Sequence, residues 1–144
     1  MPAGYSGTPL AKKLGIKDGH VVSLVEAPAG FESLLEGLPA SVALTRASSP
    51  GLANVTVAFF RDSEVLAGSI TPFAREVPAD GTLWIAWPKR ASRVETDITE
   101  DTVRGVAVPI GLVDNKVCAI DETWSGLRLV VRRENRSSWP QALD

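Results

Sequence analysis

Thr82-Leu83-Trp84-Ile85-Ala86-Trp87-Pro88-Lys89 is the most continuously apolar run in the chain, and it decides the fold. The turn signal Asp80-Gly81 precedes this run, and a basic, polar loop follows it. In a short strand, successive side chains point to opposite faces of the sheet. A run that is apolar at both odd and even positions is therefore typical of a strand in a parallel sheet whose two faces are both covered. We therefore expect residues 82–89 to form the central strand of the fold. A functional edge is expected where this strand ends, at Lys89 and Arg90.

The composition is that of an ordinary globular domain. The chain has 144 residues, of which 44% are hydrophobic and 22% are charged, and this length is enough to bury a substantial core. The net charge of −2 provides no overall field that would attract nucleic acid or an anionic membrane surface. One cysteine and one histidine exclude an internal disulfide and any metal site built from several such residues. No N-terminal apolar segment is long enough for a signal peptide or a membrane span, so we expect a soluble, cytoplasmic protein.

Hydrophobic periodicity predicts alternating strands and helices along the rest of the chain. The predicted strands occupy residues 20–27, 41–46, 55–60, 113–121 and 127–132. The predicted helices are two short ones at 8–15 and 31–35, and two amphipathic ones that begin after a cap at Asp62 or Ser63 and after a cap at Asp97 or Thr99. Thr8 is the expected cap of the first helix, and Gly15 ends it. Ser125-Gly126 is expected to centre a tight hairpin turn, which would place Trp124 at the hairpin tip.

The expected domain organisation is a single α/β domain over residues 1–136, followed by a loose tail over residues 137–144 in which Trp139 could dock. Alternating strands and helices predict a sheet with helices on both faces, and the last elements add an antiparallel hairpin. The order of the block VTVAFFRD at 55–62, a helix, the block PADGTLWI at 78–85, a helix and a hairpin resembles the last half of Rossmann-like methyltransferases. The resemblance implies a reduced, mostly parallel methyltransferase-like sheet in the order second, first, third, fourth, sixth, fifth.

Several blocks of sequence also resemble a family of short bacterial proteins that is known as a domain of unknown function. The blocks are GYSGTPLAKKLGIK at 4–17, WPK at 87–89, TDITED at 96–101, GLVD at 111–114, KVC at 116–118 and DETWSGL at 121–127. Together they extend over nearly the full chain. The resemblance implies membership of that family and no particular activity.

The turn after the first predicted strand lacks the glycines that allow a nucleotide-type cofactor to approach the backbone closely. It reads Glu26-Ala27-Pro28-Ala29-Gly30-Phe31, in which Pro28 removes a donor and Phe31 adds bulk. Arg46 stands at the end of the second predicted strand, where the fold resemblance implies an acidic residue for a ribose. We therefore expect the cofactor site to be lost or remade, and we expect no cofactor.

In open α/β sheets, ligands bind outside the carboxyl ends of the strands. The candidate ligand-binding residues at this edge are Phe31, Asp62, Lys89, Asp121 and Trp124. Lys89, facing acidic side chains and an indole, could hold a small polar or anionic ligand. Alternatively, Lys89 pairs with Asp121 or Glu122 in a salt bridge that only closes the fold, and Trp124 plugs the hairpin.

These features favour a non-catalytic module that binds a small polar ligand or a protein partner. The alternative is a transferase enzyme with a remodelled cofactor pocket. A glycine-lined groove beside residues 28–31 would favour the enzyme, and a filled edge plugged by aromatic side chains would favour the module. Catalytic residues cannot be named, and self-association stays open. No metal, nucleic acid or membrane is expected as a partner. Cys118, in a predicted strand, is expected to be a buried core residue.

Overall fold

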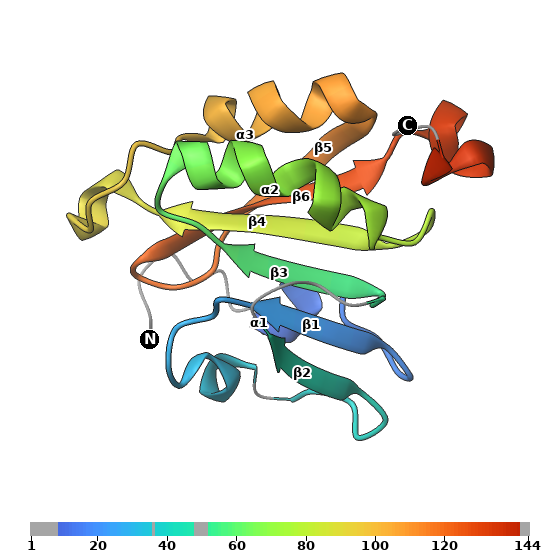
Figure 1. Cartoon of the computed structure of the whole chain (residues 1–144). Helices are drawn as coiled ribbons and strands as arrows, with labels where there is room; N and C mark the ends of the chain where they lie inside the picture. Colours follow the sequence, from blue (N-terminus) through green and yellow to red (C-terminus); the bar gives the residue numbers. More distant parts are fainter. Residues whose placement is uncertain (1–8, 36, 48–51, 142–144) are drawn as a thin grey trace.

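The computed structural model describes residues 9–35, 37–47 and 52–141, which form a six-stranded sheet in the order β2-β1-β3-β4-β6-β5 (Figure 1). The strands are β1 (Val21–Val25), β2 (Ala43–Ala47), β3 (Val55–Phe59), β4 (Thr82–Pro88), β5 (Leu112–Ala119) and β6 (Trp124–Val131). The first four are parallel, whereas β6 runs antiparallel to both β4 and β5. The predicted fold class and strand order are confirmed, including the weakest predicted strand, which forms β2 at one edge.

The strand β4 lies inside the sheet, between β3 and β6, and every one of its residues is buried. Its alternate side chains enter the two different cores of the molecule, Trp84 on one face and Ile85 on the other. This double burial explains why the strand is apolar at successive positions. The prediction that this stretch forms the central strand is confirmed.

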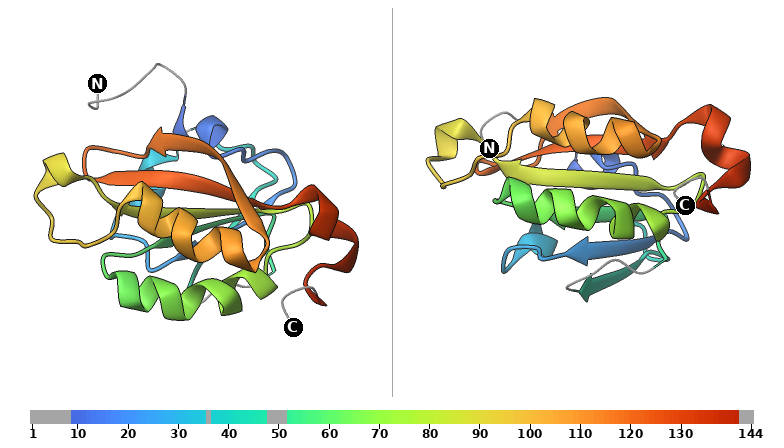
Figure 2. Two further views of the ribbon diagram at one scale, coloured as in Figure 1. Left: turned by 90° about the horizontal axis from the view of Figure 1, so that it is seen from above. Right: turned by 45° about the horizontal axis from the view of Figure 1, so that its top comes forward.

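Helices cover both faces of the sheet (Figure 2). The helices α2 (Ser63–Arg75) and α3 (Glu100–Ala107) pack on one face, where Leu66, Ile70 and Val103 meet strand side chains in the first core. The short helix α1 (Leu10–Lys13) and the 3-10 turn η1 (Phe31–Leu34) pack on the other face around Trp84 in the second core. Further 3-10 turns are η2 (Arg90–Ser92), η3 (Val108–Ile110) and η4 (Arg133–Ser138).

Local sequence signals set the helix ends. Asp62 caps α2 by accepting hydrogen bonds from two backbone N–H groups of the first turn, and Thr99 caps α3 in a capping box. Gly15 ends the first helix at φ 80°, where the N–H groups of Gly15 and Ile16 donate to the carbonyls of Lys12 and Ala11. The predicted cap at Thr8 lies outside the described residues.

The predicted hairpin turn at Ser125-Gly126 is wrong, because both residues lie inside β6. The turn comes earlier, where the carboxylate of Asp121 accepts hydrogen bonds from the N–H groups of Thr123 and Trp124 at 2.8 and 2.7 Å. Gly126 is needed for packing: a Cβ atom there would lie 3.0 Å from Ile120 and 3.1 Å from Trp84. Trp124 consequently starts a strand, paired with Pro88, and does not stand at the hairpin tip.

The C-terminal segment returns to the sheet. Trp139 follows η4, is 8% exposed, and donates its indole N–H to the carbonyl of Val77 at 3.0 Å. Docking of Trp139 is therefore confirmed, and residues 142–144 lie outside the described part. Among the helices that the structure describes, none has the length and apolar character needed to cross a bilayer.

Candidate functional site

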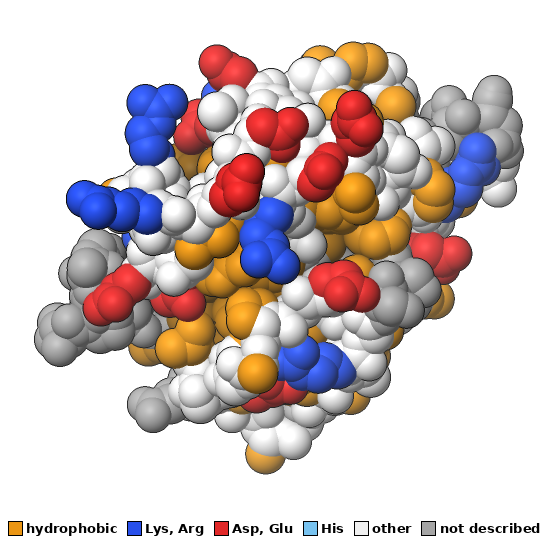
Figure 3. Space-filling view, turned by 60° about the vertical axis from the view of Figure 1, so that its left-hand side comes forward, with side chains coloured by type: hydrophobic (Ala, Val, Ile, Leu, Met, Phe, Trp, Pro, Cys, Tyr) orange, Lys and Arg blue, Asp and Glu red, His pale blue; other side chains and the backbone are white. Residues whose placement is uncertain are grey.

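A hollow of about 650 Å³ opens at the carboxyl ends of β1 and β3, and we call it the switch-point pocket. From β1 the chain goes to β2 on one side and then crosses to β3 on the other, so the strand order reverses between β1 and β3. Open α/β sheets bind ligands at such a reversal. Residues that line the pocket include Glu26, Pro28, Phe60, Asp62, Phe73 and Trp124. Figure 3 looks onto this edge and shows apolar side chains exposed across its middle, with acidic side chains gathered on the helical side.

Glu26 is the first residue after β1, and its backbone is left-handed at φ 56°. Among the described residues, only Glu26 and Arg93 combine a side chain with such a positive φ. This conformation costs on the order of 1–3 kcal/mol for a residue other than glycine, and such residues gather at functional sites. Its N–H is held by the carbonyl of Ala47 at 3.1 Å, while its side chain is exposed at the pocket.

Arg46, at the end of β2, holds the turn that follows β1. Its guanidinium donates to the carboxylate of Glu32 at 2.7 and 2.9 Å, and to the carbonyls of Ala27 and Pro28, each at 2.6 Å. The side-chain hydrogen bonds from Arg46 to the Glu32 carboxylate are the largest cause that lowers the pKa of Glu32 from 4.5 to about 2. Arg46, which replaces the expected acid, therefore fixes the turn and does not itself line the switch-point pocket.

Phe31 was expected to add bulk at the pocket, but it is buried on the α1 face of the sheet. Its ring meets Phe59 edge-on at 5.1 Å, and Phe59 meets Trp124 edge-on at 5.0 Å. This row of three aromatic rings supports the switch-point pocket, and only Phe59 and Trp124 of the three line it. Trp124 is half-buried and therefore forms part of the pocket wall without closing it.

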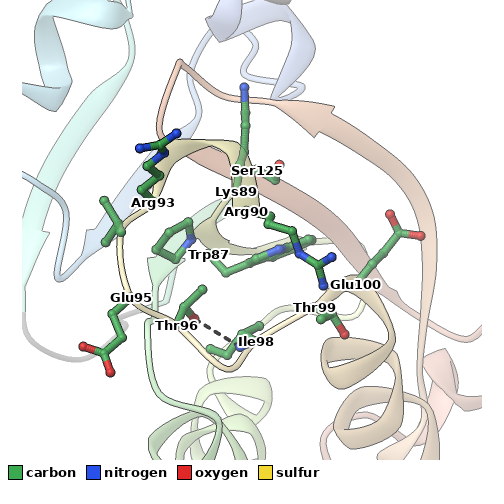
Figure 4. Close-up of a pocket in the computed structure, with 12 residues that line it drawn as sticks. Trp87, Lys89, Arg90, Arg93, Glu95, Thr96, Ile98, Thr99, Glu100 and Ser125 are labelled. Atoms are coloured by element: carbon green, nitrogen blue, oxygen red, sulfur yellow. Dashed lines mark hydrogen bonds between the residues drawn. The ribbon is translucent and has the colours of Figure 1, made fainter.

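A second hollow, of about 470 Å³, lies at the end of β4, and we call it the ring pocket because residues 89–99 loop around it (Figure 4). Figure 4 shows the indole of Trp87 inside this loop and the side chain of Arg90 reaching toward Thr99 and Glu100. The side chain of Lys89 points away from the middle of the loop.

The sequence-predicted site residues do not converge on one site. Asp62 and Trp124 share the switch-point pocket, Lys89 lines the ring pocket, and Asp121 closes the hairpin turn. The alternative salt bridge is also wrong, since in the described part of the chain Lys89 pairs with neither Asp121 nor Glu122. Its backbone N–H instead donates to the carbonyl of Thr123 at 2.7 Å.

Glu26, Phe60, Phe73 and Trp87 were missed as pocket residues by reasoning from sequence. The position of Glu26, directly after the first strand, was an available signal. The aromatic residues looked like ordinary core positions. Cys118 is half-buried on the outer strand β5 and not fully buried as expected, and this burial still raises its pKa. It lines neither pocket.

Comparisons with known proteins identify the fold. No protein-family model matches the chain, and no curated protein matches it significantly. A ribosomal protein L11 methylase from Lactobacillus delbrueckii subsp. bulgaricus is similar in structure, with TM-score 0.56, 12% identity, and coverage of 86% of this chain and 76% of that one. A putative type 11 methyltransferase from Sulfolobus solfataricus gives TM-score 0.55, 12% identity, and coverage of 85% and 89%. The O-methyltransferase NcsB1 from neocarzinostatin biosynthesis, in complex with S-adenosylmethionine, gives TM-score 0.58 and 14% identity, and the match covers 90% of this chain and 51% of NcsB1.

These findings correct the interpretation of the chain as a non-catalytic module. The three similar structures named above are methyltransferases, and the edge that an interaction module would fill with aromatic side chains holds an open pocket instead. That pocket is lined by Glu26, Ala27 and Pro28, and not by the glycines expected of an enzyme. The resemblance to an uncharacterised bacterial family remains a prediction, since no family model matches. The described chain has the fold of Rossmann-like methyltransferases.

Proposed function

We propose that the chain is a transferase whose switch-point pocket is a remodelled cofactor site. The observation that carries the proposal is the position of Glu26, which presents an exposed carboxylate from a left-handed backbone at the reversal point of a methyltransferase-like sheet. Position and strain together mark this turn as functional. The proposal departs from the expectation that the chain has no cofactor.

The residues of the pocket fit S-adenosylmethionine, the cofactor that the fold implies. The volume of the switch-point pocket, about 650 Å³, lies within the range typical of small-molecule sites. The carboxylates of Glu26 and Asp62 complement the positive charge of the sulfonium. Phe60 and Phe73, with ring centroids 5.7 Å apart, provide an apolar wall on which a flat base can pack. Bound there, the sulfonium would supply an electrophilic methyl group.

The chain's own residues would bind and orient this cofactor without a glycine-rich turn. Arg46 donates hydrogen bonds to the carbonyls of Ala27 and Pro28, so those groups are already satisfied by the protein. The turn is thereby ordered before any ligand arrives, which lowers the entropic cost of binding. Asp62 has one carboxylate oxygen committed to the cap of α2, so Glu26 is the principal acid available to a ligand.

Calorimetry with S-adenosylmethionine tests the proposal. We expect the native protein to bind it, and we expect Glu26→Gln to weaken binding about tenfold or more, since a lost charge-assisted contact costs about 1.4 kcal/mol or more. Glutamine keeps the shape of the side chain and removes only its charge.

Glu134→Gln is the matched control, because Glu134 lies in η4 at the opposite edge of the sheet (Figure 1). It should leave the affinity within about twofold, in keeping with a remote surface position. Failure of the native protein to bind the cofactor at millimolar concentration, or equal losses in both variants, would refute the proposed cofactor site.

A further inference from the structure

We infer that the ring pocket is an acceptor site for a small planar carboxylic acid, with its flat ring against Trp87 and its carboxylate on Arg90. The role as acceptor rests on the proposed function, whereas binding of the acid does not. The volume of the pocket, about 470 Å³, lies within the range of about 300–1,000 Å³ that is typical of small-molecule sites.

Lys89, Arg90 and Arg93 line this pocket together with Glu95 and Glu100, and Arg90 is the cation that reaches toward Thr99 and Glu100 in Figure 4. Lys89, Arg90 and Arg93 come from one short stretch of the loop, and within the described residues none of the three makes an ion pair. Arg90 reaches toward Glu100 in Figure 4, and the Glu100 carboxylate is already paired with Arg104. Arg104 also binds Asp114 at 2.9 Å, so this acidic group is tied back to α3 and β5. Within the part of the chain that the structure describes, Arg90 is thus a cation without an ion-pair partner that lines the hollow.

Trp87 provides the apolar surface of the pocket. It is 7% exposed at the end of β4, and its indole lies inside the loop in Figure 4. A planar ligand can pack against the part of the indole that reaches the pocket, and a guanidinium binds a carboxylate through two parallel hydrogen bonds. The two groups together select a flat molecule that carries an acid, and they disfavour a bulky aliphatic or a cationic ligand.

The loop is fixed in place before a ligand arrives. Asp97 accepts hydrogen bonds from the N–H and hydroxyl of Ser63 at 2.8 and 2.6 Å, and Thr96 donates to the carbonyl of Arg61 at 2.7 Å. The bonds with Ser63 lower the pKa of Asp97, so this anchor persists well below neutral pH. At the other end, Ser92 donates to the carbonyl of Lys89 at 2.7 Å.

A third hollow joins the two pockets. It shares Arg61 and Asp62 with the switch-point pocket, and it shares Glu95 and Thr96 with the ring pocket. The three hollows therefore lie next to one another along the carboxyl edge. A group donor in the switch-point pocket and an acceptor in the ring pocket would then be neighbours along this edge.

Titration of ¹⁵N-labelled protein with indole-3-carboxylate, followed by NMR, tests the site. We expect saturable shifts at the indole N–H of Trp87 and at the amides of residues 89–99. The native protein should bind the neutral analogue indole-3-carboxamide at least about tenfold more weakly than the acid. Arg90→Gln should bind indole-3-carboxylate at least about tenfold more weakly than the native protein does, because each change removes a charge-assisted pair. Arg133→Gln, at the opposite edge, should bind the acid as the native protein does.

Three results would overturn the inference: no binding at millimolar indole-3-carboxylate, equal affinity for the acid and the amide, or shifts that map away from Trp87. Calorimetry with S-adenosylmethionine on Arg90→Gln separates the two proposals. An acid site that persists in a protein unable to bind the cofactor would leave the ring pocket standing and remove its role as acceptor site. Cofactor binding without acid binding would refute the ring pocket as an acid site and leave the proposed cofactor site standing.

Discussion

At the scale of single residues, Gly126 shows how a missing side chain shapes the second core. The indole of Trp84 lies against Gly126 in the second core, is fully buried, and donates its N–H to the carbonyl of Leu14 at 3.0 Å. Because this bond holds the indole in place, a Cβ at residue 126 would press on a ring that cannot move aside. We expect Gly126→Ala to lower the free energy of unfolding by about 1–3 kcal/mol, as overpacking does, in equilibrium urea denaturation.

Gly105→Ala is the matched control for this substitution. Gly105 lies on the exposed side of α3, and a Cβ there meets nothing within 4 Å. The same chemical change should raise stability by about 0.5–1 kcal/mol, because alanine favours a helix interior more than glycine does. Equal effects in the two variants would mean that the contact with Trp84 does not govern residue 126.

At the scale of elements, the bond between Arg46 and Glu32 ties β2 to η1, and Arg46 also holds the carbonyls of Ala27 and Pro28, which line the switch-point pocket. The side-chain hydrogen bonds from Arg46 are the largest cause of the lowered pKa of Glu32, which is about 2 instead of 4.5. A carboxyl group with a lowered pKa stabilises the folded state fully above its ordinary pKa. This contribution is lost as the pH falls from about 4.5 through about 2.

We expect Arg46→Gln to return the pKa of Glu32 toward 4.5, and we expect the extra stability of the native protein over this variant to shrink as the pH falls from 4.5 to 2. NMR titration of the Glu32 side-chain carboxyl carbon in both proteins measures the first effect, and urea denaturation across this pH range measures the second. An unchanged pKa in Arg46→Gln would show that Arg46 does not hold the turn.

At the scale of the whole molecule, the C-terminal segment completes the first core. Trp139 packs among residues of α2, α3 and the sheet, and its indole N–H satisfies the carbonyl of Val77 just beyond α2. Gly111 leaves the room for it, since a Cβ there would lie 3.3 Å from the Trp139 ring. We expect Trp139→Ala to cost about 3–5 kcal/mol, a large share of the roughly 5–15 kcal/mol available to a domain.

Thermal and urea denaturation of Trp139→Ala and Ser138→Ala measure this cost. Ser138 is exposed next to Trp139 and should change stability within about 0.5 kcal/mol, as surface substitutions generally do. A Trp139→Ala protein as stable as the native one would show that the segment after β6 contributes nothing to the core.

The sequence by itself determined the framework of this protein. Apolar residues at successive positions placed β4 inside the sheet, because a strand that is covered on both faces buries the side chains on each face. Asp62, Thr99 and Gly15 set helix ends through bonds to backbone within a few residues, and such local signals can be read from the chain. The antiparallel final strand and the strand order followed from a fold-level resemblance.

Only the tertiary structure decided where the functional side chains meet. Gly126 carries the same local signal as a turn glycine, and the indole that requires it comes from Trp84, far away in the chain. Arg46 reaches Glu32 only because β2 pairs with β1, and Lys89 points away from the hollow that its neighbour Arg90 faces. Side-chain direction and pairing at a sheet edge depend on contacts between distant segments. The hydrophobic periodicity of one segment does not predict those contacts.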